Sequence, residues 1–209
     1  MPADAIVHVI DDDQAVRQSI EFLLRTLGMT ARSYDSASAF LNALPAIESG
    51  CIITDVRMPG VSGIDLLRRL GEMRIKMPVI VITGHGDVPL AVEAMKAGAV
   101  DFLEKPFDDE VLIGLVRSAL NRSREDAVHE AERAELLARL SNLTNRERQV
   151  LEGLIAGKPN KIIAFDLAIS PRTVEIYRAN VMTKMAAASL SELVRMALIT
   201  GVMNSGTAD

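Results

Sequence analysis

The sequence has few of the residues that mark secreted, membrane or aromatic-rich proteins. Its 209 residues include one cysteine, no tryptophan and an aromatic content of 3%. The lone Cys51 excludes an internal disulfide and is typical of a reducing compartment, so we expect a cytoplasmic protein. No apolar run approaches the roughly 20 residues that a membrane helix needs, and the first residues lack the basic cluster of a signal peptide. We therefore expect no membrane partner, while the 49% of hydrophobic residues suffices for aliphatic cores.

The net negative charge of the chain comes from its first two thirds. The formal net charge is -5 at pH 7, with residues 1–122 at -5, residues 123–140 at -2 and residues 141–209 at +2. Only the C-terminal part can therefore approach a polyanion such as DNA without an electrostatic penalty.

Apolar runs and helical patterns alternate five times in residues 1–122. This alternation predicts the α/β class, with a doubly wound, five-stranded parallel sheet and helices on both of its faces, as in flavodoxin-like domains. In such sheets the functional groups gather at the carboxyl ends of the strands. The predicted strands are residues 6–10, 31–34, 51–54, 78–82 and 100–103.

The remaining residues are helical in pattern. Residues 123–140 are charged and rich in alanine, without proline or glycine, which predicts a helical linker that continues the fifth helix. Residues 141–209 predict an all-α domain of four short helices, with a helix-turn-helix at about 161–180 and a disordered tail at 204–209. Three expected helix starts are a capping box of Thr144 with Glu147, a cap at Asn160, and Ser170 followed by Pro171.

Polar residues follow four of the predicted strands. Asp11 and Asp12 follow the first strand, Asp55 the third, Thr83 the fourth and Lys105 the fifth. Converging carboxylates need a cation, and Mg²⁺ prefers such oxygen ligands together with phosphate and water. Beside a bound cation, one carboxylate can act as a nucleophile toward phosphorus, while the lysine and the hydroxyl bind the phosphoryl oxygens. Asp13, one residue further on, is instead predicted to cap the first helix.

Four segments of residues 5 to about 122 resemble the receiver domains of two-component systems. The resemblance implies that Asp55 accepts a phosphoryl group from a sensor histidine kinase. The segments are Ile10-Asp11-Asp12, Asp55-Val56-Arg57-Met58-Pro59-Gly60, Ile82-Thr83-Gly84 and Lys105-Pro106.

The same resemblance assigns roles to further residues. It implies Thr83 and Phe102 as a switch pair, Lys105 as the phosphoryl-binding cation and a cis peptide bond before Pro106. His85 occupies a variable position, where a structural role is favoured over an influence on phosphoryl lifetime. The implied metal ligands are the side chains of Asp12 and Asp55, the main-chain carbonyl of Arg57 and, through water, Asp11.

The C-terminal part resembles the LuxR/NarL-type output domain. This resemblance rests on Leu143-Thr144-x-Arg146-Glu147, Asn160-Lys161-x-Ile163-Ala164, Ile169-Ser170-x-Arg172-Thr173-Val174-Glu175 and Asn180-Val181-x-x-Lys184-Met185. The whole chain is most similar to the FixJ subgroup. That similarity implies a phosphorylation-activated regulator of nitrogen-fixation or related genes that works with promoter DNA and RNA polymerase, and not a turnover enzyme.

Residues 171–185 are then expected to be the recognition helix in the major groove. Because a net charge of +2 gives weak binding, we expect two copies to dimerise on paired half-sites once phosphorylated. The candidates for contacts with bases are Arg172, Glu175, Ile176 and Ala179, and those for contacts with phosphates are Lys158, Lys161, Arg178 and Lys184. Thr173 is a further DNA-binding candidate.

Two alternatives compete with this interpretation. Asp11-Asp12-Asp13 also resembles the nucleophile motif of haloacid-dehalogenase-like phosphatases, with Asp11 as the nucleophile. Against it, Ala15 stands where that motif has threonine or valine, and Asp55 would have no role. The second alternative is a receiver whose last domain binds protein instead of DNA.

Overall fold

The computed structural model describes residues 6–47, 49–84 and 88–202. The chain forms two compact units that divide between Asp126 and Ala127, whereas the sequence analysis places its boundaries at 122 and 140. His85 and the tail at 204–209 lie outside the described residues.

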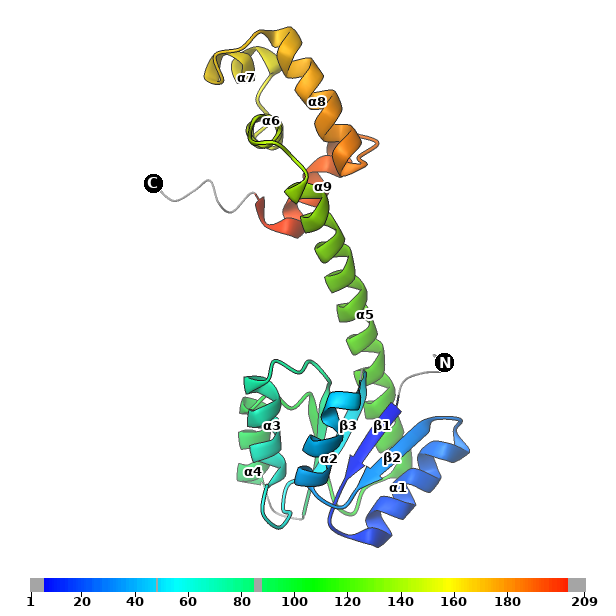
Figure 1. Cartoon of the computed structure of the whole chain (residues 1–209). Helices are drawn as coiled ribbons and strands as arrows, with labels where there is room; N and C mark the ends of the chain where they lie inside the picture. The colour runs from blue at the N-terminus through cyan, green and yellow to red at the C-terminus, as the bar shows by residue number, and fades with distance from the viewer. Residues whose placement is uncertain (1–5, 48, 85–87, 203–209) are drawn as a thin grey trace. The chain divides into compact units, whose positions relative to one another are not determined.

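The first unit is a five-stranded parallel sheet in the order β2-β1-β3-β4-β5, with helices on both faces (Figure 1). The predicted α/β class is therefore confirmed. The strands are β1 Ile6–Ile10, β2 Thr30–Tyr34, β3 Gly50–Asp55, β4 Val79–Thr83 and β5 Asp101–Glu104. The helices are α1 Gln14–Thr26, α2 Ala37–Ala43, α3 Gly63–Glu72, α4 Val88–Lys96 and α5 Asp109–Ser141, with a 3₁₀ turn at Leu44–Ala46.

Alternating side chains of the strands supply two aliphatic cores, one on each face of the sheet. Val9 of β1 packs with Ile20 of α1 and Leu112 of α5 on one face. Ile10, the next residue, packs on the other face with Phe40 of α2, in a cluster that also holds residues of α3 and α4. Since neighbouring strand residues point to opposite faces, β1 is buried on both sides. The sheet is thereby fixed in place, and its strand ends are presented at one edge.

The second unit is the predicted bundle of short helices. Thr144 and Glu147 form the expected capping box, and Ser170 caps a helix that has Pro171 in its first turn. The expected cap at Asn160 is wrong, because Pro159 takes that position without a side-chain hydrogen bond. The fixed φ of proline gives the chain the extended turn that a cap residue needs. The helices are α6 Asn145–Ile155, α7 Asn160–Asp166, α8 Pro171–Met185 and α9 Leu190–Thr200.

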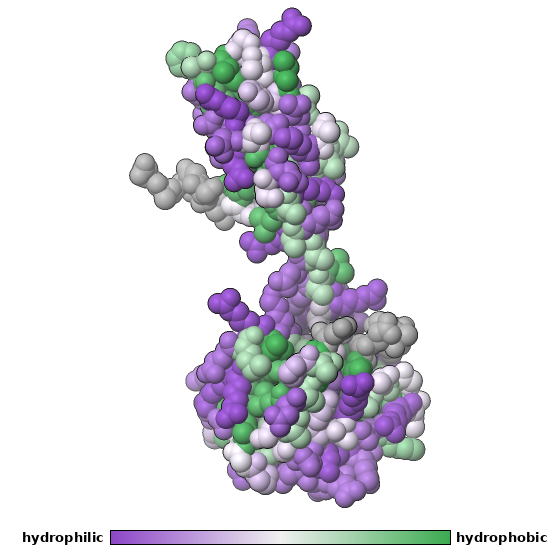
Figure 2. Space-filling view, in the orientation of Figure 1, coloured by the Kyte–Doolittle hydropathy of each residue, from purple (hydrophilic) through white to green (hydrophobic). Residues whose placement is uncertain are grey.

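Helix α5 is 33 residues long and includes residues 123–140, for which the sequence predicts a helical linker. The last turns of α5 form part of the core of the second unit, because Leu136 and Leu140 are buried there with Val150 of α6 and Val181 of α8. Hydrophilic residues cover most of the visible surface of each unit (Figure 2). None of the helices in the described ranges is long and apolar enough to cross a membrane.

Candidate functional site

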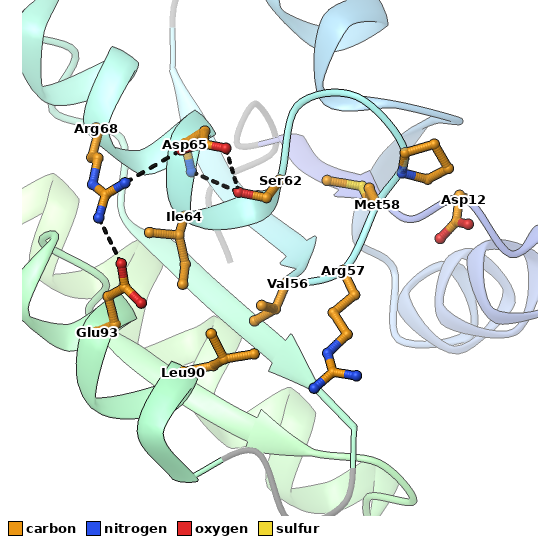
Figure 3. Close-up of a pocket in the computed structure, with 11 residues that line it drawn as sticks. Asp12, Val56, Arg57, Met58, Ser62, Ile64, Asp65, Arg68, Leu90 and Glu93 are labelled. Carbon is orange, nitrogen blue, oxygen red and sulfur yellow. Dashed lines mark hydrogen bonds and ion pairs between the residues drawn. The ribbon is translucent and has the colours of Figure 1, made fainter.

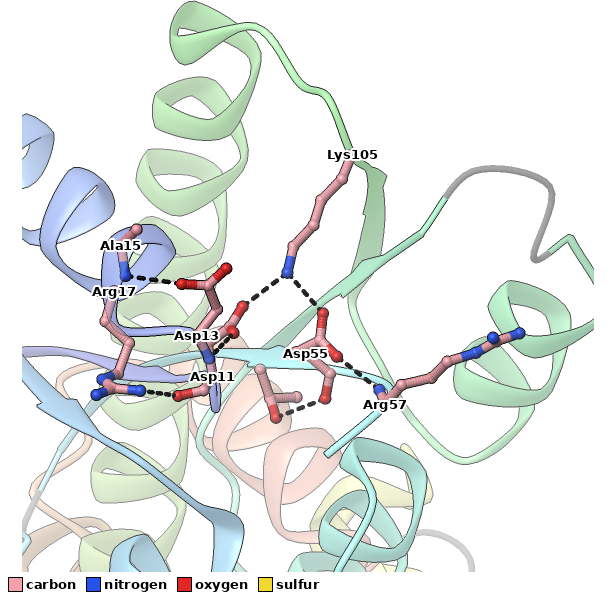
Figure 4. Close-up of polar contacts among 8 residues, drawn as sticks. Asp11, Asp13, Ala15, Arg17, Asp55, Arg57 and Lys105 are labelled. Atoms are coloured by element: carbon pink, nitrogen blue, oxygen red, sulfur yellow. Dashed lines mark hydrogen bonds and ion pairs between the residues drawn. The ribbon is translucent and has the colours of Figure 1, made fainter. Parts of the chain in front are cut away.

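The carboxyl ends of β1, β3 and β5 bring three of the predicted site residues together (Figure 4). The Lys105 ammonium donates to Oδ2 of Asp11 and to Oδ1 of Asp55, each at 2.7 Å. Both carboxylates are buried, with only 2% of Asp11 and 8% of Asp55 exposed. Two acidic groups taken out of water thus share one cation.

The strand register explains why these carboxylates meet. Ile10 of β1 pairs with Thr54 of β3, so the residues that follow them leave neighbouring strands at the same level. Oδ1 of Asp11 accepts from the Asp13 amide at 2.8 Å, and Oδ2 of Asp55 accepts from the Arg57 amide at 2.6 Å. The main chain therefore orients each carboxylate.

Three further features lie in the loops that follow the strands. The side chain of Asp13 accepts from the Ala15 amide, which confirms it as the cap of α1. A Cβ atom on Gly63 would lie 2.2 Å from the Asp55 carbonyl oxygen, so only glycine lets α3 begin this close to the acidic strand end. The cis Lys105–Pro106 bond is also present as predicted.

The electrostatics of the cluster reflect burial and pairing. Burial raises the pKa of Asp55, and the neighbouring Asp11 charge adds to this, although the hydrogen bonds from Lys105 and the Arg57 amide act against it. Burial lowers the pKa of Lys105, but the hydrogen bonds to the two carboxylates outweigh it and raise that pKa overall. Lys105 therefore stays charged while it faces the Asp55 carboxyl.

Asp12 and Arg57 line a hollow of about 640 Å³ beside the cluster (Figure 3). Arg68 of α3 reaches across to Glu93 of α4 at 2.6 Å and to Asp65 at 3.3 Å. In the described part of the chain, no three Asp, Glu, His or Cys side chains converge into a group that could hold a metal ion. Asp12, which is exposed, thus does not form a compact three-carboxylate cluster with Asp11 and Asp55.

The predicted switch residues lie on the neighbouring strands β4 and β5. Thr83 is 2% exposed, and its hydroxyl donates to the Gly84 carbonyl over a long distance of 3.5 Å. Phe102 is 44% exposed. It pairs with Val81 in the sheet, two residues before Thr83, so Thr83 and Phe102 point to the same face of the sheet. A buried hydroxyl with a weak partner and a half-exposed ring share that face.

In the second unit, α8 buries one stripe and exposes another. Val174, Val181 and Met185 are buried. Thr173 and Arg178 are half-buried, and Lys161 is exposed on α7. The residues exposed on α8 among the predicted base contacts are Arg172, Glu175, Ile176 and Ala179.

Lys184 has a role that the sequence analysis missed. Its ammonium donates to Oε2 of Glu147 at 2.7 Å and to the Asn142 carbonyl at 3.3 Å. Glu147 is only 3% exposed, and the hydrogen bond from Lys184 lowers the pKa of this carboxyl. A partner 37 residues away in the sequence gives no local signal, so only the structure reveals this pair.

Comparison with known proteins identifies both units. Residues 7–117 match the response regulator receiver domain, and residues 141–197 match the luxR family of bacterial regulatory proteins. The transcriptional regulatory protein FixJ of Azorhizobium caulinodans is 61% identical over 202 residues, which cover 97% of this chain and 96% of that protein. This chain is a two-component response regulator of the FixJ family.

Other relatives of the regulator agree with this membership. FixJ of Bradyrhizobium diazoefficiens is 55% identical over 95% of this chain and 97% of its own length. The crystal structure of full-length FixJ from B. japonicum is 54% identical and covers 95% of this chain and 98% of its own, with a TM-score of 0.61. The response regulator StyR is 40% identical, with a TM-score of 0.82 over 93% of this chain and 98% of its own.

Family membership bears on the two alternatives from the sequence. The matches give no support to a phosphatase with Asp11 as nucleophile, since response regulators of this type are transcription factors and are not normally enzymatic. The luxR-type unit implies DNA binding, and the receiver implies a histidine kinase as partner. Receiver domains in general use Mg²⁺ at the phosphorylation site.

Proposed function

We propose that Asp55 accepts the phosphoryl group and that α8 reads promoter DNA. The observation that carries the first part is the Lys105 ammonium, 2.7 Å from both Asp11 and Asp55. An Asp55 oxygen attacks the phosphorus of a phosphohistidine, the N–P bond breaks, and its electron pair stays on the imidazole nitrogen. The product is an acyl phosphate on Asp55, whose new oxygens Lys105 can bind as a point charge.

The donor set fits Mg²⁺. Asp11 and Asp55 offer buried carboxylate oxygens at adjacent strand ends. The exposed Asp12 follows Asp11, and the Arg57 carbonyl belongs to the second residue after Asp55. A hard cation that keeps several waters needs only one or two carboxylates and the phosphate. When bound, Mg²⁺ would offset the repulsion between the Asp55 carboxylate and the incoming phosphoryl group.

The DNA-binding part of the proposal assigns base contacts to Arg172, Glu175, Ile176 and Ala179, with Thr173 as a further DNA-binding residue. Lys161 and Arg178 would contact phosphates, because one cation per phosphate supplies affinity without sequence selection. Lys184 remains a candidate for a phosphate contact only if its ammonium leaves the buried Glu147.

Phosphorylation is proposed to promote a homodimer that binds paired half-sites and activates transcription by RNA polymerase. The target class is proposed to be nitrogen-fixation or related genes. The support is the chain's similarity to two proteins named as transcriptional regulatory protein FixJ.

A labelling experiment tests the phosphoryl acceptor. The full chain is incubated with a small-molecule phosphodonor and Mg²⁺, and the modified residue is mapped by mass spectrometry. We expect label on Asp55, none in Asp55→Asn, and undiminished label in the matched variant Asp65→Asn, which removes a half-exposed carboxylate on α3. Label on Asp11, or full labelling of Asp55→Asn, would contradict the proposal and favour the phosphatase chemistry.

A further inference from the structure

The last turns of α5 belong structurally to the DNA-binding unit. Leu136 is 5% exposed and Leu140 is 7% exposed, and both pack in the cluster that holds Val181 and Met185 of α8. Leu143, just beyond α5, is buried in the same cluster. The end of α5 is therefore fixed against the helix that the proposed function places in the major groove.

Arg139 lies between these leucines and makes two directed contacts. One guanidinium nitrogen donates to the Met185 carbonyl at 2.9 Å, and the other donates to Glu135 at 2.7 Å, one turn earlier in α5. The side chain is 31% exposed, so water only partly screens these contacts. A planar guanidinium can serve two acceptors in fixed directions, which a lysine ammonium does less well.

Met185 is the last residue of α8, and Ala186 after it turns into the left-handed region at φ 53°. The last four carbonyls of a helix lack partners inside the helix, and the negative end of the helix dipole lies there. The Arg139 guanidinium on α5 donates to the Met185 carbonyl and so caps the C-terminal end of α8 from another helix. Arg139 therefore holds the C-terminal end of α8 from the side of α5.

A second cation also holds this end of α8. Lys184, the neighbour of Met185, donates to Glu147 of α6 and to the Asn142 carbonyl. The final turn of α8 is thus held by α5 through Arg139 and by α6 through Lys184. Since α8 is a continuous helix, fixing its last turn also fixes the direction of the exposed stripe that begins at Arg172.

We propose that Arg139 is a positioning residue for DNA recognition, which caps the recognition helix and ties its placement to the helical state of the last turns of α5. This inference rests on the proposed function, because it takes α8 to be the helix that reads bases. Arg139 itself touches no base in this proposal. It acts by keeping α8 in the orientation that aligns its outward residues with base edges.

The test uses the phosphorylated full chain and duplexes that this chain enriches from a random-sequence pool. Arg139→Ala and Arg139→Lys are compared with Arg133→Ala, which removes an equal charge from an exposed site on α5. We expect Arg139→Ala to lose about ten-fold in affinity for the enriched duplex, the effect of one charge-assisted hydrogen bond. Affinity for a scrambled duplex should not change, and Arg139→Lys should lie between Arg139→Ala and the parent.

Two further readouts separate positioning from other roles. Hydrogen exchange of the amides near residue 186 should speed up in Arg139→Ala and stay unchanged in Arg133→Ala. The salt dependence of binding should keep its slope, because a direct phosphate contact would lower that slope by about one.

Four results would overturn the inference: unchanged affinity in Arg139→Ala, equal losses on both duplexes, a reduced salt slope, or unchanged exchange near residue 186. If the parent chain enriches no duplex, the proposed function fails. The exchange measurement then still decides whether Arg139 holds the end of α8.

Discussion

At the scale of single residues, the ammonium of Lys105 stands between two buried carboxylates. Removing one partner from a buried ionic cluster leaves charge uncompensated, which costs about 3 kcal/mol in comparable cases. We expect Lys105→Ala to lose about that much free energy of unfolding in the first unit. Added Mg²⁺ should stabilise this variant more than the parent, because the cation replaces the lost charge and binds the folded state.

The measurement is urea denaturation in EDTA and in Mg²⁺, followed by tyrosine fluorescence. The chain has two tyrosines and no tryptophan, so a Tyr177→Phe background leaves Tyr34 as a reporter of the first unit. Lys96→Ala, which removes an exposed lysine on α4, is the control. An equal response to Mg²⁺ in the variant and the parent would show that Lys105 and the metal do not share these carboxylates.

His8, in the middle of β1, supplies a pH-dependent prediction. It is fully buried, and its pKa is lowered from 6.5 mainly by burial, with a smaller contribution from the Arg32 charge and opposition from the Ser49 backbone. The unfolded chain therefore binds a proton at higher pH than the folded chain does. The stability of the first unit falls as pH drops from 6.5 toward the lowered pKa and levels off below it.

Replacing His8 with glutamine should remove this part of the pH dependence. Between pH 7.5 and 5.5 the parent should lose more free energy of unfolding than His8→Gln, because only the parent has a histidine at position 8 that takes up a proton on unfolding. The same Tyr34 signal measures it, and His129→Gln, at an exposed site on α5, serves as the control. Identical pH slopes in the parent and His8→Gln would contradict the prediction.

At the scale of elements, the end of α5 decides where the DNA-binding unit begins. A fragment of residues 141–209 lacks Leu136 and Leu140, each a buried leucine of the core. Burial of one leucine contributes about 1.5–3 kcal/mol. We expect the fragment 127–209, which follows the observed division of the chain, to be several kcal/mol more stable than 141–209.

Thermal and urea denaturation of the two fragments, followed by circular dichroism, measure this difference. A matched double variant of the longer fragment, with Leu136 and Leu140 both changed to alanine, should fall most of the way to the shorter one. Equal stability of 127–209 and 141–209 would mean that the α5 turns rest on the core without stabilising it.

Local signals in the sequence predict most elements and fail where partners are distant. The caps at Asp13 and Thr144 were predicted because a capping side chain bonds to the chain within three residues. The prediction at Asn160 is wrong because asparagine has the residue type of a cap, whereas the fixed φ of Pro159 places the extended cap residue one position earlier. The thin apolar stripe of Leu136 and Leu140 indicates a helix, but periodicity cannot tell which unit covers that stripe.

The same limit applies to the candidate site. Asp11, Asp55 and Lys105 were predictable as neighbours, because parallel strands end at one edge and each residue follows a strand. The ion pair between Lys184 and Glu147 was not predictable from the sequence, since every exposed lysine in a basic domain is a candidate for a phosphate contact. Sequence patterns place side chains on elements, while ion pairs between elements depend on packing that the patterns do not contain.

At the scale of the whole molecule, the two units carry net charges of opposite sign. Phosphorylation of Asp55 in the first unit would have to change DNA binding by the second. Thr83 is buried with a weak hydrogen bond, and Phe102 is half-exposed on the same sheet face. New phosphoryl oxygens on Asp55 would draw the Thr83 hydroxyl inward and vacate space for the ring. The face of α4 and β5 would then repack. This face carries Lys96 on α4 and Asp101 on β5, so opposite charges can pair across a two-fold axis.

We therefore expect phosphorylation to promote dimerisation and DNA binding together. A coupling of ~1–3 kcal/mol changes occupancy about ten- to a hundred-fold. Sedimentation and binding to enriched duplexes are measured for the full chain with and without a phosphodonor, for Asp55→Asn, and for the fragment 127–209. The phosphorylated chain should dimerise and bind tightly, Asp55→Asn should do neither, and the fragment should bind regardless of the phosphodonor. Equal binding by the phosphorylated and unphosphorylated full chains would mean that the receiver does not control the DNA-binding unit through Asp55.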